Sequence, residues 1–217
     1  MSREITAKQP DEVSIGGIVL CGGKSSRMGS PKAWLEFGNE RLLQRVVRIL
    51  SAVVDPIVVV AAQDQELPDL NQEIEIVEDE FPGRGPLSGI YSGLNRLAER
   101  RVDFAYVTAC DCPFLKTGLV QFLIDQLDGD CQIVLIDDGK FKHVLSAIYS
   151  TAISGTAKSL MAKEQFRPLS LTDFHSTKSI GVDDVRPVDE KLESLVNLNS
   201  PSDYQAAISR LQEPGAN

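Results

Sequence analysis

Short apolar runs alternate with amphipathic segments along most of this chain, and this alternation constrains the fold more than any other feature. The runs expected to form strands are residues 16–21, 57–62, 73–78, 103–109, 131–136 and 144–149. The segments with the apolar spacing of helices are 42–53, 88–100 and 117–127. A further strand at 195–198 and a helix at 200–211, capped by Ser200, are expected near the C-terminus.

Strands that alternate with helices of about 10–14 residues favour right-handed βαβ crossovers and a mostly parallel sheet. We therefore expect an α/β fold: one three-layer α/β/α domain of Rossmann-like type. A length of 217 residues fits one such domain. We expect this domain to span residues 16–212, between a flexible tail at 1–15 and a loose end at 213–217.

Composition excludes several classes of function. The net charge of −9 disfavours nucleic acid as a partner, because its phosphates would be repelled. Only two histidines are present, His143 and His175, so multi-histidine metal chemistry is disfavoured. The four cysteines lack a Cys-x-x-Cys spacing and suit reduced, buried thiols. Without a signal-like apolar core near the start or an apolar run long enough to cross a bilayer, a cytoplasmic protein is expected.

The loop at 22–32 is rich in glycine and basic residues and directly follows the first expected strand. Ligands of open α/β sheets bind at the carboxyl ends of the strands, where backbone N–H groups of such a loop can approach a phosphate chain. The sequence matches neither a Walker A loop nor a dinucleotide fingerprint. Residues 24–48 carry six Lys or Arg and two Glu, which favours a polyphosphate site. The structural alternative is an ordinary turn, and Arg41, Arg45 and Arg48 are expected to form a solvated helix face.

Two carboxylates follow other strands. Asp111 comes just after the strand at 103–109 and next to Pro113, where a lone carboxylate suits Mg²⁺ with substrate phosphates. An Asx turn or a helix cap is its structural alternative. Asp79 follows the strand at 73–78 and is a candidate for a ribose hydroxyl, a base or the metal, although alone it is typical of a loop. Together the loops at 22–32, 79–87 and 110–116 indicate a nucleotide and Mg²⁺.

The motifs also support a family resemblance. Leu20-Cys-Gly-Gly-x-Ser-x-Arg-Met-Gly-x-x-Lys32 resembles the opening signature of the small nucleotidyltransferases that modify molybdopterin, most closely the molybdenum cofactor guanylyltransferases (MobA-type). Further motifs recur in that family's order: Glu78-Asp79, Gly85-Pro-Leu-Ser-Gly89, Cys110-Asp111-x-Pro113 and Val196-Asn197-x-Asn199-x-Pro201. The match covers residues 16 to about 212. The glycine pair at 22–23 and Gly85-Pro86-Leu87 favour the guanylyl branch over the cytidylyl branch.

The resemblance implies a role for each matching residue. Leu20, Cys21, Gly22 and Gly23 would contact GTP, and Asp79 would help to bind it. Lys32 would reach the phosphates, and Arg27 would join it in stabilising the leaving pyrophosphate. Asp111 would hold both GTP and Mg²⁺, and Asn199 is a candidate on the acceptor side, near the metal. The nucleotide half would be about 16–115 and the acceptor half about 116–212.

The implied reaction is Mg²⁺-dependent transfer of GMP from GTP to the terminal phosphate of molybdopterin, which releases pyrophosphate. The attacking phosphate oxygen is already ionised, so no general base is needed. The implied partners are GTP, molybdopterin and molybdoenzyme-maturation proteins, with no nucleic acid and no membrane.

Three positions depart from the family pattern. Cys21 stands where Ala is usual, Ala61-Ala62-Gln63 lacks an Asn that relatives use for guanine, and His143 is followed by Val144 instead of Pro. His143 is expected to be structural, and His175 a surface residue. Two alternatives remain: a molybdopterin cytidylyltransferase or sugar-phosphate nucleotidyltransferase, and a nucleotide-binding partner protein without catalysis. The presence of both Lys32 and Asp111 disfavours the last.

Overall fold

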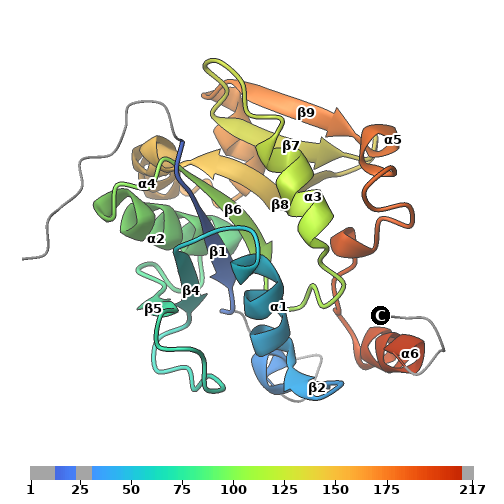
Figure 1. The fold of residues 1–217 in the computed structure, drawn as a ribbon. Coiled ribbons are helices and arrows are strands. Elements are labelled where there is room, and N and C mark those ends of the chain that lie inside the picture. The colour runs from blue at the N-terminus through green and yellow to red at the C-terminus, as the bar shows by residue number, and fades with distance from the viewer. Residues whose placement is uncertain (1–12, 23–30, 212–217) are drawn as a thin grey trace, which may run out of the picture.

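The computed structural model describes residues 13–22 and 31–211, and their main feature is one seven-stranded sheet with the strand order β5-β4-β1-β6-β8-β7-β9 (Figure 1). Its strands are β1 (Ile15–Leu20), β4 (Ile57–Ala61), β5 (Glu75–Glu78), β6 (Phe104–Ala109), β7 (Ile133–Asp137), β8 (Lys142–Ser150) and β9 (Thr177–Gly181). β8 runs antiparallel to both of its neighbours, and the other neighbouring pairs are parallel. The expected mostly parallel sheet is therefore confirmed.

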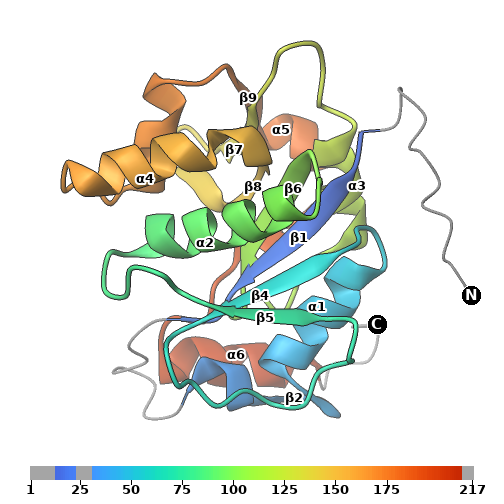
Figure 2. The same ribbon diagram turned by 90° about the vertical axis from the view of Figure 1, so that its left-hand side faces the viewer.

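Helices cover both faces of this sheet (Figure 2). α2 (Pro86–Glu99) and α4 (Ser154–Ala162) lie side by side on one face, and α1 (Leu42–Ser51), α3 (Thr117–Ile124) and α5 (Val182–Val185) lie on the other. This arrangement is the expected three-layer α/β/α fold. In the part of the chain that the structure describes, none of the helices has the length and apolar character needed to cross a bilayer.

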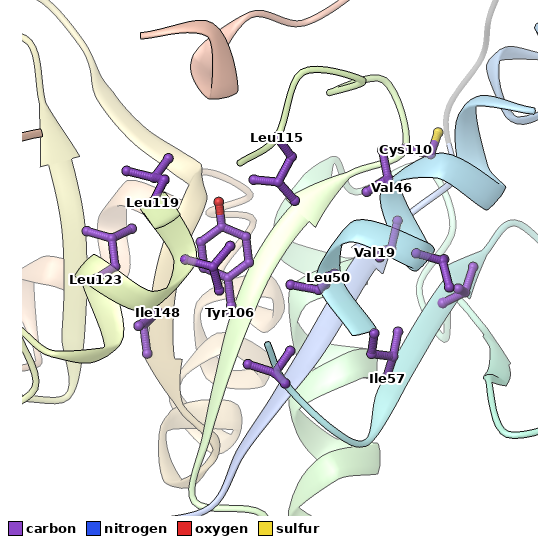
Figure 3. Close-up of a cluster of buried hydrophobic side chains, with 14 of the residues drawn as sticks. Val19, Val46, Leu50, Ile57, Tyr106, Cys110, Leu115, Leu119, Leu123 and Ile148 are labelled. Carbon is purple, nitrogen blue, oxygen red and sulfur yellow. The ribbon is translucent and has the colours of Figure 1, made fainter. Parts of the chain in front are cut away.

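Alternation of side chains along the buried strands supplies a core to each face. In β1, Val19 packs toward α1 and α3, whereas Ile18 and Leu20 pack toward α2 and α4. Figure 3 shows the first of these cores, where apolar side chains of α1 and α3 meet those of the central strands. Because the central strands are buried on both faces, they are continuous apolar runs in the sequence.

A small substructure lies beside the sheet. It consists of the hairpin strands β2 (Glu36–Phe37) and β3 (Glu40–Arg41) and the last helix, α6 (Pro201–Leu211). Phe37 and Leu42 pack with Leu198 and Ala207 in a separate apolar cluster. This packing brings the C-terminal part of the chain back to the segment that follows the glycine-rich loop.

Several expected elements differ from the observed ones. The strand expected at 195–198 is wrong, because these residues form the end of a 3-10 turn, η4 (Glu193–Leu195), followed by chain outside the sheet. The helix expected from Ser88 begins at Pro86, after Gly85 adopts a φ of +69° that favours glycine. β9, α4 and α5 were not expected from the sequence. β9 lies at the edge of the sheet and buries only Ile180, so its sequence lacks the apolar run that indicates a buried strand. The tail expected at 1–15 is too long, because Ile15 begins β1 and Ser14 donates to Asp103 Oδ2. Residues 1–12 and 213–217 lie outside the described residues, so the rest of both tails stays a prediction.

The contact of α2 with β1 depends on Gly93. A Cβ atom at this position would lie 2.7–2.9 Å from three side-chain carbons of Ile18. We expect Gly93→Ala to destabilise the protein by about 1–2 kcal/mol. Three contacts below 3.0 Å place the overpacking at about 2–3 kcal/mol, the upper part of its usual range, and the gain in helix propensity offsets about 1 kcal/mol of it. Urea denaturation would measure the change. Gly155→Ala in α4, where a Cβ meets no atom within 4 Å, is the matched control and should cost nothing. Equal stability of the two variants would contradict this packing.

Candidate active site

The carboxyl ends of β4, β1 and β6 lie side by side, so the loops that follow them start together. The backbone N–H of Cys21, after β1, donates to the carbonyl of Val60 in β4 at 2.8 Å. On the other side, the N–H of Cys110, after β6, donates to the carbonyl of Leu20 at 3.0 Å. Open α/β sheets bind their ligands at this edge.

An ion pair joins two of these loops. Lys32 Nζ lies 2.5 Å from Asp111 Oδ2, although the two residues are 79 positions apart in the sequence. Lys32 begins a 3-10 turn, η1 (Lys32–Trp34), and Asp111 follows β6. Their side chains are only 20% and 10% exposed. The two residues predicted to handle phosphate and metal are therefore in direct contact.

Two asparagines from the C-terminal part of the chain complete this group, which we call the Lys32–Asp111 cluster (Lys32, Asp111, Asn197 and Asn199). Asn197 Nδ2 donates to Asp111 Oδ1 at 3.2 Å, and Lys32 Nζ donates to Asn199 Oδ1 at 3.4 Å. The N–H of Leu198 donates to the backbone carbonyl of Asp111 at 3.0 Å. The structure thus brings Asn199 to the site as expected. Asn197 was missed as a site residue, although its spacing of two from Asn199 could have indicated it.

The oxygen donors of the cluster suit Mg²⁺. This ion prefers carboxylate and carbonyl oxygens and is commonly held by one or two carboxylates together with substrate phosphates. Within residues 13–22 and 31–211, no three His, Cys, Asp or Glu side chains gather as a metal site. A metal at this place would therefore have Asp111 as its protein carboxylate, with amide oxygens of the asparagines close by.

The chain segments that follow β1 and β4 lie against each other. A Cβ atom at Gly22 would lie 3.4 Å from the backbone nitrogen of Ala62. Gln65 bridges the two strand ends, because its Oε1 accepts from the N–H of Ala62 and its Nε2 donates to the carbonyl of Cys21. Gln65 therefore ties the chain after β4 to the chain after β1. Gly23 and Arg27 lie outside the described residues.

Asp79 lies apart from the Lys32–Asp111 cluster. It follows β5, three strands from β6, which corresponds to roughly 14 Å at about 4.8 Å per strand. Its Oδ1 accepts hydrogen bonds from the N–H of Phe81 and from the hydroxyl of Ser88 in the first turn of α2. Asp79 therefore organises the loop before α2, and it does not share a metal site with Asp111.

The three arginines at and before α1 form ion pairs on this face of the helix. Arg48 is 61% exposed, as expected of a solvated face, and pairs with Glu40. Arg45 pairs with the same carboxylate, and Arg41, in β3, pairs with Glu36. Arg45 Nε also donates to the carbonyl of Pro113 at 2.7 Å, so this arginine supports the loop that carries Asp111. These three arginines are therefore paired with glutamates of the β2–β3 hairpin.

Both histidines have hydrogen-bond partners. His143 Nε2 lies 3.1 Å from Asp138 Oδ2. His175 is half-buried, and its Nδ1 lies 2.9 Å from Gln132 Oε1, so the expectation of a surface residue is wrong. Burial lowers the pKa of His175 and thus favours its neutral form. The thiols of Cys110 and Cys112 are buried on either side of Asp111 in the sequence. The neighbouring Cys21 thiol and burial raise the pKa of Cys110. Burial raises the pKa of Cys112.

Asp189 supports the segment that carries the asparagines. This fully buried carboxylate pairs with Lys116 Nζ at 2.8 Å and accepts from the N–H groups of Glu193 and Ser194. Burial works against its ionisation, but these donors outweigh it and hold the pKa of Asp189 below its usual range. No motif in the sequence distinguishes Asp189 from other loop carboxylates, which is why it was not expected.

The chain is similar in sequence to known proteins of one family. A family model described as the MobA-like NTP transferase domain matches residues 17–175. A probable molybdenum cofactor guanylyltransferase of Mycobacterium ulcerans is 34% identical over 207 residues, which cover 94% of this chain and 98% of that protein. The chain belongs to this family. The resemblance indicated by the sequence motifs is thus confirmed, and the protein is a nucleotidyltransferase.

A further relative carries the same name, and two solved structures have a similar fold. A probable molybdenum cofactor guanylyltransferase of Mycobacterium tuberculosis is 35% identical, over 92% of this chain and 96% of its own length. Among solved structures, molybdopterin-guanine dinucleotide biosynthesis protein A from Archaeoglobus fulgidus matches with a TM-score of 0.73 at 21% identity, over 89% of this chain and 97% of that one. A 4-diphosphocytidyl-2C-methyl-D-erythritol synthase from Anaerococcus prevotii matches with 0.67 at 16% identity, over 93% and 99%. The two structures show that the nucleotidyltransferase fold is shared.

Asp189 provides a test of the supporting network. We expect Asp189→Asn to cost about 1–3 kcal/mol of stability, because Lys116 and a backbone donor lose a charged partner. The pKa of Asp189 is lower in the folded state than in the unfolded state. Its ionised form therefore contributes fully to the free energy of unfolding above the unfolded pKa of about 3.9, and this contribution is lost as the pH falls through the folded pKa. Urea denaturation at pH 7 and at pH 3 should therefore show a smaller difference between variant and wild type at pH 3. Asp128→Asn, at an exposed pair with Lys178, is the control and should change stability by less than about 1 kcal/mol at either pH.

Proposed function

We propose that this enzyme transfers GMP from GTP to the terminal phosphate of molybdopterin, in a Mg²⁺-dependent reaction that releases pyrophosphate. The observation that carries the proposal is the Lys32–Asp111 cluster, where a cation, a carboxylate and two amides from three distant parts of the chain meet at the end of β6. Relatives of the same length that are named molybdenum cofactor guanylyltransferases support the choice of substrates.

The reaction places a phosphate monoester oxygen of the acceptor against the α-phosphorus of GTP. A new P–O bond forms there, and the bond between the α-phosphorus and the bridging oxygen breaks, so that pyrophosphate leaves with the electron pair. The attacking oxygen is ionised at neutral pH and needs no general base. Catalysis then rests on positioning two anions and on neutralising the charge that develops.

Lys32 is suited to the second of these tasks. Its ammonium has three donors, and in the described structure it reaches both Asp111 and Asn199. A triphosphate that enters beside η1 would accept hydrogen bonds from the same nitrogen. We expect the guanidinium group of Arg27, in the preceding loop, to donate to the triphosphate as well. Asp111 would then be free of its ion pair and able to serve as a ligand.

Mg²⁺ fits the oxygen donors of Asp111, and when bound it would supply charge neutralisation to the phosphate oxygens. Asn197 donates to Asp111 Oδ1, so it fixes the orientation of the carboxylate toward such an ion. The nucleoside would extend from Asp111 across the ends of β1 and β4 toward Asp79. Leu20, Cys21, Gly22 and Gly23 would offer backbone contacts along this path. We also propose that the enzyme works in the cytoplasm and passes its product to molybdoenzyme-maturation proteins.

Substitution at the ion pair tests this assignment. We expect Lys32→Ala and Asp111→Asn each to lower turnover at least about 100-fold. The first removes a positive charge that would neutralise the phosphates, and the second removes the carboxylate charge that would hold Mg²⁺. The assay follows pyrophosphate release and formation of the guanine dinucleotide from GTP and molybdopterin. Thermal unfolding should show that both variants remain folded.

Lys163→Ala, at an exposed lysine after α4, is the control for loss of a positive charge and should retain wild-type turnover. Near-normal activity of either ion-pair variant would overturn the assignment. Dinucleotide formation from CTP in preference to GTP would instead move the enzyme to the cytidylyl branch.

A further inference from the structure

The last helix, α6, contacts the segments that build the active site, although it contributes no residue to the Lys32–Asp111 cluster. It lies outside the layers of the main sheet, beside the β2–β3 hairpin (Figure 2). Its residues were expected from the sequence to form a helix, but no binding or catalytic role was expected for any of them. Both of its ends make polar contacts with chain that leads to the cluster.

The first turn of α6 holds the backbone of Asn199. Asp203 Oδ2 accepts from the N–H of Asn199 at 2.9 Å and from the N–H of Ser200 at 2.8 Å. In return, the N–H of Asp203 donates to the hydroxyl of Ser200 at 3.2 Å, which completes a capping box at the start of the helix. The asparagine that accepts from Lys32 is therefore fixed directly to the first turn of α6.

The last turn of α6 reaches two further segments through Arg210. The guanidinium carbon of Arg210 lies 4.4 Å from the centroid of the Phe114 ring, three residues after Asp111. The same guanidinium group pairs with Glu193, four residues before Asn197. A planar guanidinium can stack on an aromatic face and donate to a carboxylate at the same time. Arg210 thus contacts both of the segments that meet at the cluster.

A second arginine holds Phe114 from its other side. The ring of Phe37 lies edge-on to that of Phe114, with centroids 5.5 Å apart and an angle of 81° between the planes. The guanidinium carbon of Arg45 lies 5.1 Å from the centroid of Phe37, and Arg45 Nε donates to the carbonyl of Pro113. Two rings between two cations therefore connect α1 to α6 through the loop that follows Asp111.

Glu193 joins the remaining contacts. It pairs with Lys116 Nζ at 2.9 Å as well as with Arg210, and its side chain is 20% exposed. The hydrogen bond from Lys116 holds the pKa of Glu193 below its usual range, and the charge of Arg210 adds to this effect. Glu193 is therefore ionised at neutral pH. One carboxylate links the chain after β6, the chain before Asn197 and the last turn of α6.

We propose that Arg210 is a positioning residue of the transfer reaction, which holds the loop after Asp111 and the segment that carries Asn197 in the arrangement that binds Mg²⁺. The inference rests on the proposed function, because it concerns the ion and the phosphates of that reaction. Arg210 acts through Phe114 and Glu193 and does not touch the reacting groups. Residues that orient a metal ligand without touching the metal typically change metal affinity or activity by about 10–100-fold.

Nucleotide binding and turnover of Arg210→Ala test the inference. Trp34 is the one tryptophan of the chain and lies two residues after Lys32, so its fluorescence can report GTP binding. We expect the Kd for GTP to rise at least 5-fold in the presence of Mg²⁺ and to stay within 2-fold of wild type in EDTA. At saturating GTP, Mg²⁺ and molybdopterin, kcat should fall at least 10-fold. A role in stability alone would change none of these values.

Arg96→Ala is the matched control. The Arg96 side chain is 38% exposed and pairs with Glu75, which is 18% exposed, and the values for Arg210 and Glu193 are 40% and 20%. Glu75 is the first residue of β5, at the end of that strand away from the binding loops. We expect this variant to lose as much Tm as Arg210→Ala and to keep the wild-type Kd and kcat.

Arg210→Lys is the conservative variant. It keeps a positive charge opposite Glu193 but has no planar group to stack on Phe114. We expect its Kd for GTP with Mg²⁺ and its kcat to lie between those of the wild type and Arg210→Ala. This variant also provides the measurement if Arg210→Ala does not fold.

The outcomes separate the inference from the proposed function. Wild-type kcat and Kd in the folded Arg210 variants would overturn the inference, even if their Tm is lower. The same defects in Arg96→Ala would also overturn it, because loss of stability would then explain them. If the wild type binds GTP with Mg²⁺ but forms no guanine dinucleotide from molybdopterin, the proposed function fails, and the Mg²⁺-dependent Kd still decides the role of Arg210. A wild type that binds no GTP would contradict both.

Discussion

The ion pair between Lys32 and Asp111 is the interaction on which the rest of the site depends. A pair that is this little exposed is stable only if further hydrogen bonds compensate for the loss of water. Asn197 and Asn199 supply those bonds, and they do so from a segment more than 80 residues beyond Asp111. The start of η1, the end of β6 and the C-terminal segment are thereby fixed relative to one another. Any substrate that binds here meets groups from the whole length of the chain.

The C-terminal segment that carries the two asparagines needs support from other parts of the fold. The segment from 193 to 199 has no strand or long helix of its own, so other residues must hold it. Asp189 and Lys116 anchor its start, and the apolar cluster around Phe37 and Leu198 anchors its end. Arg45 performs a similar task for the loop after Asp111 through the carbonyl of Pro113. Charged side chains away from the reacting groups thus position the site.

The antiparallel strand β8 reverses the direction of the chain next to β6. The parallel strands β5, β4, β1 and β6 align their carboxyl ends at one edge, which suits an extended nucleotide. Because β8 runs the other way, its start lies at that same edge, and its first residues line a pocket that Asn197 also lines. One reversal of direction therefore brings the start of β8 beside the carboxyl ends of the parallel strands.

Much of this could be predicted from the sequence. Buried strands such as 57–62 and amphipathic helices such as 42–53 have strong periodic patterns, and strand-end residues such as Lys32 and Asp111 follow from the topology. The pattern fails where burial is slight or partners are distant. β9 buries one side chain, and Asn197 meets Asp111 only because the chain between them folds back. The apolar residues at 195 and 198 indicate a strand, but they pack in two different clusters instead of pairing with the sheet.

The central claim is that GTP with Mg²⁺ binds at the Lys32–Asp111 cluster. Thermal unfolding of the wild type and of Asp111→Asn with GTP, CTP, UTP or ATP, each with and without Mg²⁺, tests it most directly. A ligand at one hundred times its Kd adds about 2.7 kcal/mol, or roughly 5–10 °C in Tm for a chain of this size. We expect the wild type to show such a shift only when GTP and Mg²⁺ are both present. We expect Asp111→Asn to show no such shift under the same conditions. A shift selective for CTP, a shift independent of Mg²⁺, or an undiminished shift in the variant would contradict the claim.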